Sequence, residues 1–444
     1  MQRPRAGSRT VASKWRFSRT TNSRTPHRKA KSINRTGTIV SPAGRSAHGG
    51  GLRTVAADVI LRRLLPVAAC LLFLCSSLSA QWLGDAESEL HTRKGIDFIY
   101  NLKFDSARAE LRFLIKHQPD HPAGYFFLAM IDWWRIVTDF GNTAYDEKLL
   151  RELDRVIDLC DQRLDKNEND LPALFFKGGA LGFEGRLHGN REDWVKAANC
   201  GREALPIVRK AYHLDTANYD ILLGMGIYNY YAAVVPDHYP FVKPLMVFFP
   251  EGDRARGMRQ LRLAADSARY AGVEAQYFLM QICLNFENNY PEALRLAISL
   301  TSRYPDNPLF QRYLGRCNAS NLRWSEAETV FEEILHRTKE QRPGYDRYTE
   351  REAEYYLGWI EMNRGDLEKA LSFLYHTDDL SRALDVKGAS GFMALANLRI
   401  GMIYDLQKKR DLAVAQYKKV LDMNDFQNAH TQASRYLASA YTGN

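Results

Sequence analysis

The C-terminal half of the chain repeats itself with a period of 34 residues. Aromatic, small and aliphatic positions coincide when the segment around residue 290 is aligned with the segment around residue 324. The matched pairs are Tyr290 with Trp324, Ala293 with Ala327, Ala297 with Phe331, and Leu300 with Ile334. A period of this length predicts stacked supersecondary units, because one unit cannot bury its apolar face alone and needs its neighbours to cover it.

Small residues recur at two positions of this unit along most of the chain. Glycine occupies the eighth position at Gly95, Gly179, Gly224, Gly315, Gly358 and Gly401, and alanine the twentieth at Ala107, Ala293, Ala327, Ala370 and Ala413. Pro119 and Pro305 fall near position 32, where a proline ends a helix. Small residues let two helices approach closely while larger apolar residues fill the seam. The unit is therefore predicted to be a pair of packed helices.

This pattern resembles the tetratricopeptide repeat family, in its bacterial exported form. The resemblance implies an all-α fold, a right-handed α-solenoid of about eight helix–turn–helix repeats over residues 85–444. Their first helices are expected to begin near residues 88, 122, 172, 217, 274, 308, 351 and 394. Near the end of the chain, Ala433, Leu437 and Ala440 share one helical face. They predict a capping helix, which covers the apolar face of the last repeat.

By the same resemblance, the first helices line a concave binding surface. Its predicted contact residues are apolar or aromatic: Phe126, Trp133, Phe176, Phe183, Tyr228, Phe278, Tyr355 and Trp359. Only Arg312 and Arg316 are basic at the inward positions, so we do not expect the carboxylate clamp of family members that bind C-terminal peptides. An apolar surface of more than a few hundred Å² is either a binding site or must be covered.

An apolar insert interrupts the fourth unit at residues 230–252. Its sequence includes AVVPDHYPFVKPLMVFFPEGD, and four prolines argue against a membrane-spanning helix: Pro236, Pro240, Pro244 and Pro250. Three roles stay open for residues 232–250: a plug that covers the aromatic surface, a lid or partner-docking element, and a loop that touches a membrane. The predicted contact residues of the insert are Tyr239, Phe241, Phe248 and Phe249.

The end of this insert resembles a second family. With its helix start at Asp253, the stretch FFPEGDRARGMRQLRLAA is similar to the centre of the eukaryotic inclusion-body-clearance family. That family is also built on tetratricopeptide-type repeats, so the resemblance implies a shared architecture without a shared process.

Charge is distributed unevenly along the chain. There are 61 Lys and Arg against 52 Asp and Glu, a formal net charge of +9. Fifteen of the basic residues and one acidic residue lie in residues 1–63, so the remainder is slightly acidic. Because no basic stripe remains to follow a phosphate backbone, we expect no nucleic-acid partner.

Residues 61–80 have the order of a secretory signal peptide. Arg62 and Arg63 precede an apolar core and a small-residue tract that ends at Ala80. The core is shorter than the ~20 apolar residues of a spanning helix, so we expect cleavage near Ala80 and export to the periplasm or cell envelope. The alternative is an uncleaved N-terminal membrane anchor. Residues 1–60 cannot bury a core, and are predicted to be a disordered extension, a transit peptide, or untranslated.

No catalytic motif, cofactor site or metal-ligand spacing is evident, so we expect no enzyme activity, no cofactor and no bound metal. The segment from Asp165 begins like a calcium loop but lacks its glycine and its final glutamate, which predicts a turn. The four cysteines after residue 80 are predicted to be buried apolar residues: Cys160, Cys200, Cys283 and Cys317.

The sequence therefore favours a non-enzymatic scaffold outside the cytoplasm, which binds protein partners of unknown identity in the cell envelope. Peripheral association with the membrane stays open. The alternative is a binding module for a lipid, a glycan or a hydrophobic peptide, with residues 232–250 as its lid.

Overall fold

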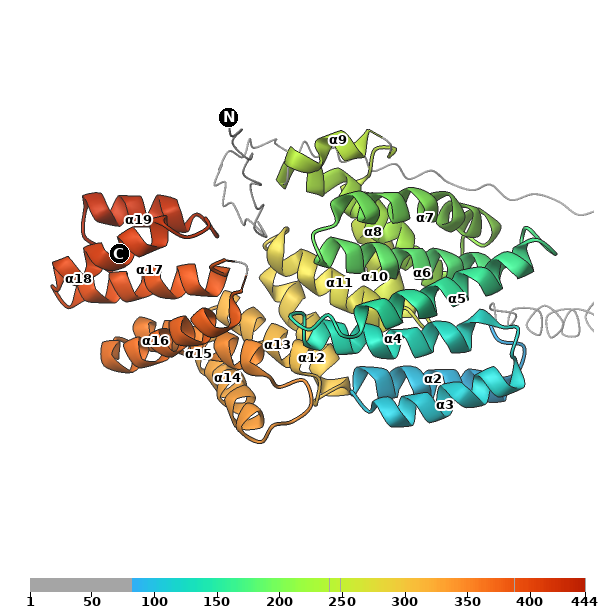
Figure 1. Cartoon of the computed structure of the whole chain (residues 1–444), viewed down its shortest axis with the longest axis horizontal. Helices are drawn as coiled ribbons and strands as arrows, with labels where there is room; N and C mark the ends of the chain where they lie inside the picture. The colour runs from blue at the N-terminus through green and yellow to red at the C-terminus, as the bar shows by residue number, and fades with distance from the viewer. Residues whose placement is uncertain (1–81, 239, 248, 387, 444) are drawn as a thin grey trace, which may run out of the picture. The chain divides into compact units, whose positions relative to one another are not determined.

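The computed structural model describes residues 82–238, 240–247, 249–386 and 388–443. From residue 85 onward the described chain belongs to one compact unit and contains eight helix pairs (Figure 1). The pairs are α2 (Ala86–Tyr100) with α3 (Phe104–His117), α4 (Pro122–Thr138) with α5 (Asp146–Leu164), α6 (Leu171–Asn190) with α7 (Trp194–Leu214), α8 (Tyr219–His238) with α10 (Arg254–Ser267), α11 (Gly272–Asn285) with α12 (Tyr290–Arg303), α13 (Pro308–Ser320) with α14 (Trp324–Lys339), α15 (Arg347–Arg364) with α16 (Leu367–Leu384), and α17 (Gly391–Leu406) with α18 (Arg410–Leu421). The described residues form no strand.

The predicted α-solenoid of helical repeats is confirmed. Each first helix begins within four residues of its predicted start, and each packs on the second helix of its own pair. Each second helix in turn packs on the first helix of the next pair. This serial packing is what a stack of repeats requires, because each unit covers the apolar face of its neighbour.

Small residues lie where the two helices of a pair touch. A Cβ atom on Gly315 would approach the Phe331 ring to 2.5 Å, and one on Gly358 would come within 2.7 Å of Leu374 Cγ. Ala327 is fully buried at the corresponding place on a second helix. The small residues of the repeat pattern are therefore set by how closely the two helix backbones approach.

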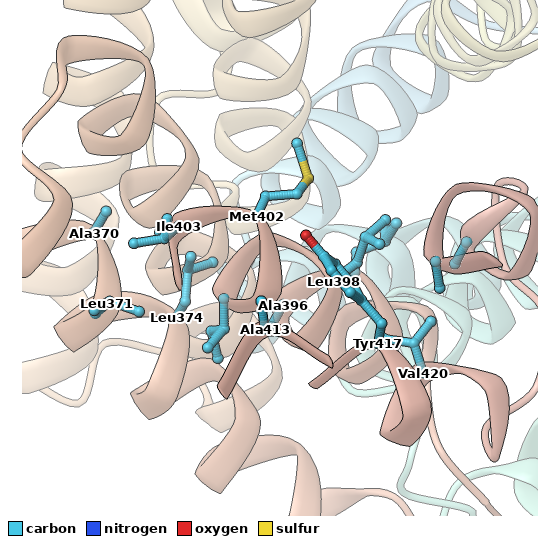
Figure 2. Packing of buried hydrophobic residues seen from close by; sticks show 14 of the residues in the cluster. Ala370, Leu371, Leu374, Ala396, Leu398, Met402, Ile403, Ala413, Tyr417 and Val420 are labelled. Carbon is cyan, nitrogen blue, oxygen red and sulfur yellow. The ribbon is translucent and has the colours of Figure 1, made fainter. Parts of the chain in front are cut away.

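The last repeat is covered by the predicted capping helix, α19 (Ala429–Ala438). Ala429 and Ala433 are fully buried against the cluster that α15 to α18 form. Figure 2 shows the middle of this cluster, where Tyr417 and Val420 of α18 lie beside Leu398 of α17. Without α19 this apolar face would be exposed to water.

Two parts of the chain that are far apart in sequence also pack together. Asp97 in α2 accepts hydrogen bonds from Arg303 Nη2 at 2.7 Å and from Tyr304 Oη at 2.8 Å. Asn307 Nδ2 donates to the Tyr100 carbonyl at 2.9 Å, and α4 packs on α13. We call these contacts, made by α2, α4 and α6 with α11, α12 and α13, the closure. A stack with neighbour contacts alone would lack them.

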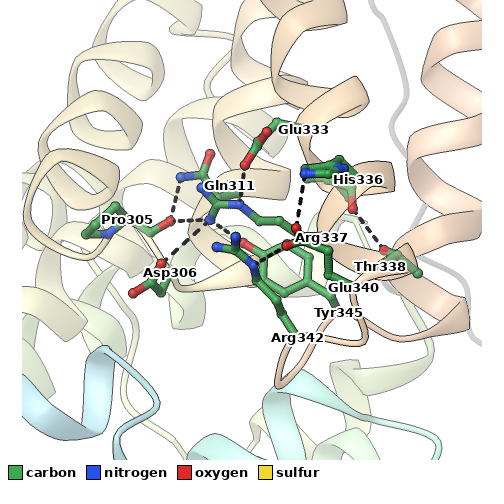
Figure 3. Close-up of polar contacts among 11 residues, drawn as sticks. Pro305, Asp306, Gln311, Glu333, His336, Arg337, Thr338, Glu340, Arg342 and Tyr345 are labelled. Atoms are coloured by element: carbon green, nitrogen blue, oxygen red, sulfur yellow. Dashed lines mark hydrogen bonds and ion pairs between the residues drawn. The ribbon is translucent and has the colours of Figure 1, made fainter.

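A side chain from α14 holds the turn between α12 and α13. Arg337 Nη1 donates to the Pro305 carbonyl at 2.7 Å, and Nε donates to Glu333 at 2.6 Å (Figure 3). The same guanidinium donates to Tyr345 Oη at 2.9 Å. Because α12 ends at Arg303, Pro305 lies just past the second helix, as its position in the repeat predicts.

The insert begins as a continuation of α8. This helix runs through Pro236 to His238 and is followed by a 3-10 turn, η2 (Pro240–Val242), and by the short helix α9 (Lys243–Met246). The first proline of the insert, Pro236, therefore does not end α8. Proline removes one hydrogen bond and crowds the preceding turn, yet the helix here accommodates it.

The remainder of the insert returns to its own repeat. Tyr228 Oη donates a hydrogen bond to the Pro250 carbonyl. Gly252 lies so close to α8 that a Cβ atom would come within 2.5 Å of the Asn229 carbonyl oxygen. Phe249 reaches α7, where it lies 3.5 Å from the position of a Cβ on Gly201.

The predicted signal peptide and the segment before it, residues 1–80, lie outside the described residues. Within the described part of the chain, no helix combines the length and the apolarity needed to cross a membrane.

Candidate binding surface

Half of the predicted binding surface lies in the interior of the protein. Phe126, Trp133, Phe176 and Tyr355 are each at most 7% exposed. A side chain this buried cannot contact a ligand unless the repeats separate. The prediction that these four residues line an open surface is corrected: they pack the solenoid.

Later repeats cover the neighbouring aromatic residues of α4. Trp134 of α4 contacts Tyr100 with ring centroids 5.0 Å apart and Phe310 of α13 at 5.5 Å. Phe127 contacts Tyr270, which precedes α11, at 5.7 Å. Aromatic pairs at these separations stabilise beyond the area they bury. The aromatic wall of the early repeats is thus covered by the closure.

The plug hypothesis for residues 232–250 stays a prediction, because three of its four predicted contact side chains lie outside the described residues. The described contacts of the insert are with α7, α8 and Phe286, whose ring lies 5.3 Å from that of His238. They are not with the aromatic cluster of α4 and α6. The predicted contact residues Tyr239 and Phe248, and the side chain of Phe241, lie outside the described residues. Phe249, the fourth, is partly buried.

An arginine of α6 also takes part in the closure. Arg186 of α6 stacks over the rings of Trp133 at 4.7 Å and Phe278 at 4.5 Å. Its Nη1 lies 3.4 Å from Glu274 Oε2 on α11. Burial raises the pKa of Glu274, and the positive charge of Arg186 opposes that shift. Arg186 was not singled out from the sequence, because nothing in its own repeat indicates a partner 88 residues away.

The other half of the predicted surface is partly exposed: Phe183, Tyr228, Phe278 and Trp359. Phe183 and Phe278 lie beside the closure, since Phe183 contacts Trp133 at 5.3 Å and Arg186 covers Phe278. Tyr228 anchors the end of the insert through its hydroxyl. Trp359 is therefore the one of the four that contacts neither the closure nor the insert in the described residues.

Trp359 pairs with a cation from the next repeat. The guanidinium carbon of Arg399, on α17, lies 4.2 Å from the Trp359 ring centroid. Arg399 Nε also donates to Tyr355 Oη at 3.1 Å, and the Trp324 ring meets Trp359 edge-on at 5.4 Å. Both Trp359 and Arg399 are partly exposed. This pair, which we call the Trp359–Arg399 patch, is the surface that best fits a ligand.

Arg312 and Arg316 are neutralised within the solenoid. Arg312 Nη2 lies 2.6 Å from Glu352 Oε2 on α15, and Arg316 Nη2 donates to the same oxygen at 2.5 Å. Burial would raise the pKa of Glu352, yet the two positive charges and their hydrogen bonds lower it to about 2. These arginines are therefore structural, in agreement with the absence of a carboxylate clamp expected from the sequence.

The four cysteines are free and buried, as predicted. Cys160, Cys283 and Cys317 are fully buried, and burial raises the pKa of each thiol to about 12. The predicted turn after Asp165 is also confirmed, since Asn167 Oδ1 accepts from the Asn169 amide at 3.1 Å ahead of α6. His117 ends α3 and His121 caps α4, so the two do not share a helix.

Comparison with known proteins found a family model that matches part of the chain. Residues 286–346, which begin just after α11 and contain α12, α13 and α14, match a family model described as tetratricopeptide repeat. No curated protein sequence matches the chain. A solved structure of the human IFIT1 dimer with m7Gppp-AAAA is similar with a TM-score of 0.41 and 12% identity, over 81% of this chain and 87% of that one. The human IFIT1 dimer with PPP-AAAA gives 0.39 and 13%, over 81% and 86%. Residues 286–346 thus match tetratricopeptide repeats, and the described chain from residue 85 onward is a solenoid of helical repeats.

Proposed function

We propose that this protein is a non-enzymatic scaffold that binds a protein partner through the Trp359–Arg399 patch on its last two repeats. Solenoids of helical repeats commonly act by presenting extended surfaces to other proteins. Here aromatic residues of α4 pack on Tyr270 and α13, whereas Trp359 of a later repeat stays partly exposed.

The observation that carries the proposal is a partly exposed tryptophan stacked on a partly exposed arginine, 4.2 Å apart. Tryptophan and arginine are the side chains most enriched where interfaces gain most of their binding energy. Stacking also holds both side chains in place before a partner arrives, which reduces the entropy lost on binding. A protein partner with an apolar anchor beside a carboxylate fits this pair.

The proposed compartment is the periplasm or cell envelope. It rests on the order of basic, apolar and small residues over 61–80, which is typical of a secretory signal. Free, fully buried cysteines are compatible with an oxidising compartment, since buried thiols are shielded from oxidants. Fusion of residues 1–85 to a reporter enzyme that is active only after export tests this part. Reporter activity that stays in the cytoplasm would refute it.

The binding proposal is tested by comparing Trp359→Ala, Arg399→Ala and the unchanged chain as baits against an envelope extract. Leu412→Ala is a control on another helix, because Leu412 is 48% exposed on α18, whereas the patch lies on α15 and α17. We expect the partner to be captured by the unchanged chain and by the control. Loss of an anchor costs about 2 kcal/mol or more, so each patch variant should bind at least about 30-fold more weakly. Equal capture by all four baits would refute the patch.

The alternative function, binding of a lipid, glycan or hydrophobic peptide under residues 232–250, has less support. Such a ligand needs the aromatic surface of the early repeats, and the closure occupies it. Native mass spectrometry of the purified protein distinguishes the two functions. A retained small molecule would favour the alternative, whereas a bare chain mass favours the scaffold.

A further inference from the structure

We propose that Glu184, His188 and Cys200 form a zinc site in the third repeat. Glu184 and His188 come from α6, and Cys200 comes from α7. Each offers one ligand atom, and these three atoms all lie within 4.8 Å of one another. The site is independent of the Trp359–Arg399 patch, which lies four repeats later.

The two ligands on α6 share one helical face. A spacing of four residues brings side chains to the same side of a helix. His188 Nε2 lies 3.5 Å from Glu184 Oε1. The side chains of His188 and Glu184 are 14% and 23% exposed, so an ion can reach them from solvent, whereas Cys200 is only 7% exposed. The arrangement places the sulfur at the inner end of the site and the two α6 ligands at its outer end.

A glycine brings the sulfur within reach of α6. A Cβ atom on Gly185 would lie 3.1 Å from Cys200 Cβ and 3.4 Å from the Ala197 carbonyl oxygen. The two helices therefore approach closely at the residue that follows Glu184. Because α6 and α7 are joined by a short turn, the whole ligand set comes from one local hairpin, and little chain entropy is lost when the ion closes it.

The ligand set favours Zn²⁺. Thiolate, imidazole and carboxylate are its three usual protein ligands, at about 2.0 to 2.3 Å from the metal. Bonds of that length put the ligands of one ion within roughly 4 Å of each other, so small side-chain rotations suffice here. Calcium and magnesium take oxygen ligands, and a thiolate excludes them. Three protein ligands leave a fourth tetrahedral position for water.

A second group of three, Glu350, Glu354 and His376, also has ligand atoms within 4.8 Å. It carries no sulfur, and His376 Nδ1 already pairs with Glu354 at 3.0 Å. The His376 side chain is 48% exposed. The ion pair between the buried Glu354 and the exposed His376 accounts for this group, which makes it an internal control for the zinc proposal.

The proposed site lies beside the insert. Phe249, near the end of the insert, packs against Gly201, the residue that follows Cys200. A bound ion would join α6 to α7 at the residue next to this contact. Because its ligands come from both helices, the zinc would stiffen the hairpin on which the insert rests.

The test is zinc binding by the reduced, full-length protein, measured by equilibrium dialysis with elemental analysis. We expect one Zn²⁺ per chain. Replacing a ligand should weaken zinc binding by more than about 10-fold. Even the mutation of a residue that only hydrogen-bonds to a ligand can weaken metal binding that much. Cys200→Ser and His188→Ala should show this loss. Cys160→Ser and His376→Ala are the matched controls and should bind as the unchanged protein does.

Co²⁺ provides a second readout that reports the sulfur directly. With Co²⁺ bound, the unchanged protein and Cys160→Ser should show a thiolate-to-cobalt charge-transfer band that Cys200→Ser lacks. Far-ultraviolet circular dichroism checks that each variant is folded. If Cys200→Ser has lost helix, zinc binding by His188→Ala is the deciding measurement, because His188 is only partly buried. No zinc bound by the unchanged protein, equal binding by His188→Ala, or bound Co²⁺ without the charge-transfer band would each overturn the proposal.

Discussion

The sharpest stability prediction concerns Glu352, which joins α13 to α15. Its side chain is fully buried and accepts hydrogen bonds from Arg312 and Arg316. Glu352→Gln keeps the shape and removes the charge, which leaves two guanidinium groups facing each other without an anion. Removing one partner of a buried ion pair typically costs about 3 to 5 kcal/mol. We expect a loss of that size at pH 7.

The pH dependence of this loss follows from the pKa of Glu352. Its pKa is about 2 in the folded protein, against 4.5 for a glutamate exposed to water. Each pKa unit corresponds to about 1.4 kcal/mol, so the ionised carboxylate contributes on the order of 3 kcal/mol. Because the folded pKa is lowered, this contribution is fully present above pH 4.5 and is lost as the pH falls towards 2. The difference between the unchanged protein and Glu352→Gln should therefore shrink over that window.

The assay is urea unfolding at constant ionic strength between pH 7 and pH 3, followed by circular dichroism. Glu147→Gln is the control, because the Glu147 side chain is 89% exposed and its pair with Arg151 should contribute little. Its stability should follow that of the unchanged protein at every pH. A difference between the unchanged protein and Glu352→Gln that stays constant with pH would refute the electrostatic reasoning.

Two further stability predictions follow from the same structure. Gly257→Ala should destabilise the protein by about 1 to 3 kcal/mol in thermal unfolding, because the new Cβ would lie 2.5 Å from the Tyr230 amide nitrogen. Gly182→Ala, on an open part of α6, should stabilise it by about 0.5 to 1 kcal/mol. A loss of stability in both variants would contradict the packing account. Burial, and then the charge of Asp132, raise the pKa of Glu152 to about 7, so its ionised form disfavours folding as the pH rises from 4.5 through 7. Glu152→Gln should accordingly raise the free energy of unfolding at pH 8 by about 1 to 2 kcal/mol, with a smaller gain at pH 5, and an equal effect at both pH values would contradict this assignment.

The repeat architecture could be predicted because it depends on local contacts. Gly315 and Ala327 lie where two helix backbones touch, and only small side chains fit there. Such small residues recur in most of the repeats at the same distance from the start of a helix. The sequence itself therefore indicates where the helices begin. The cap was predictable for a similar reason, since Ala433 must cover the last apolar face.

The closure could not be predicted from the sequence. Whether repeat two meets repeat six depends on small rotations that accumulate from one repeat to the next. Trp134 and Phe310 are aromatic whether they face each other or an open surface, so residue type does not distinguish the two cases. This is why Phe126 and Trp133 were predicted to bind a ligand and are instead buried.

The proposed zinc ligands were missed because they come from two helices. A search for closely spaced cysteines and histidines does not find them. The signal available in the sequence was Glu184 four residues before His188 on a predicted helix, with Cys200 one short turn later. Only the close approach of α6 and α7 at Gly185 brings the three ligand atoms together.

The closure is tested most directly by a double-mutant cycle between Trp134 on α4 and Phe310 on α13, whose ring centroids are 5.5 Å apart. Trp134→Ala, Phe310→Ala and the double variant are compared by their free energies of unfolding. We predict a coupling energy of about 0.5 to 1.5 kcal/mol, the usual range for an aromatic pair in contact. A control cycle between Trp134 and Val420 of α18 should be additive. Additivity in the Trp134 and Phe310 cycle as well would contradict the contact between the second and sixth repeats.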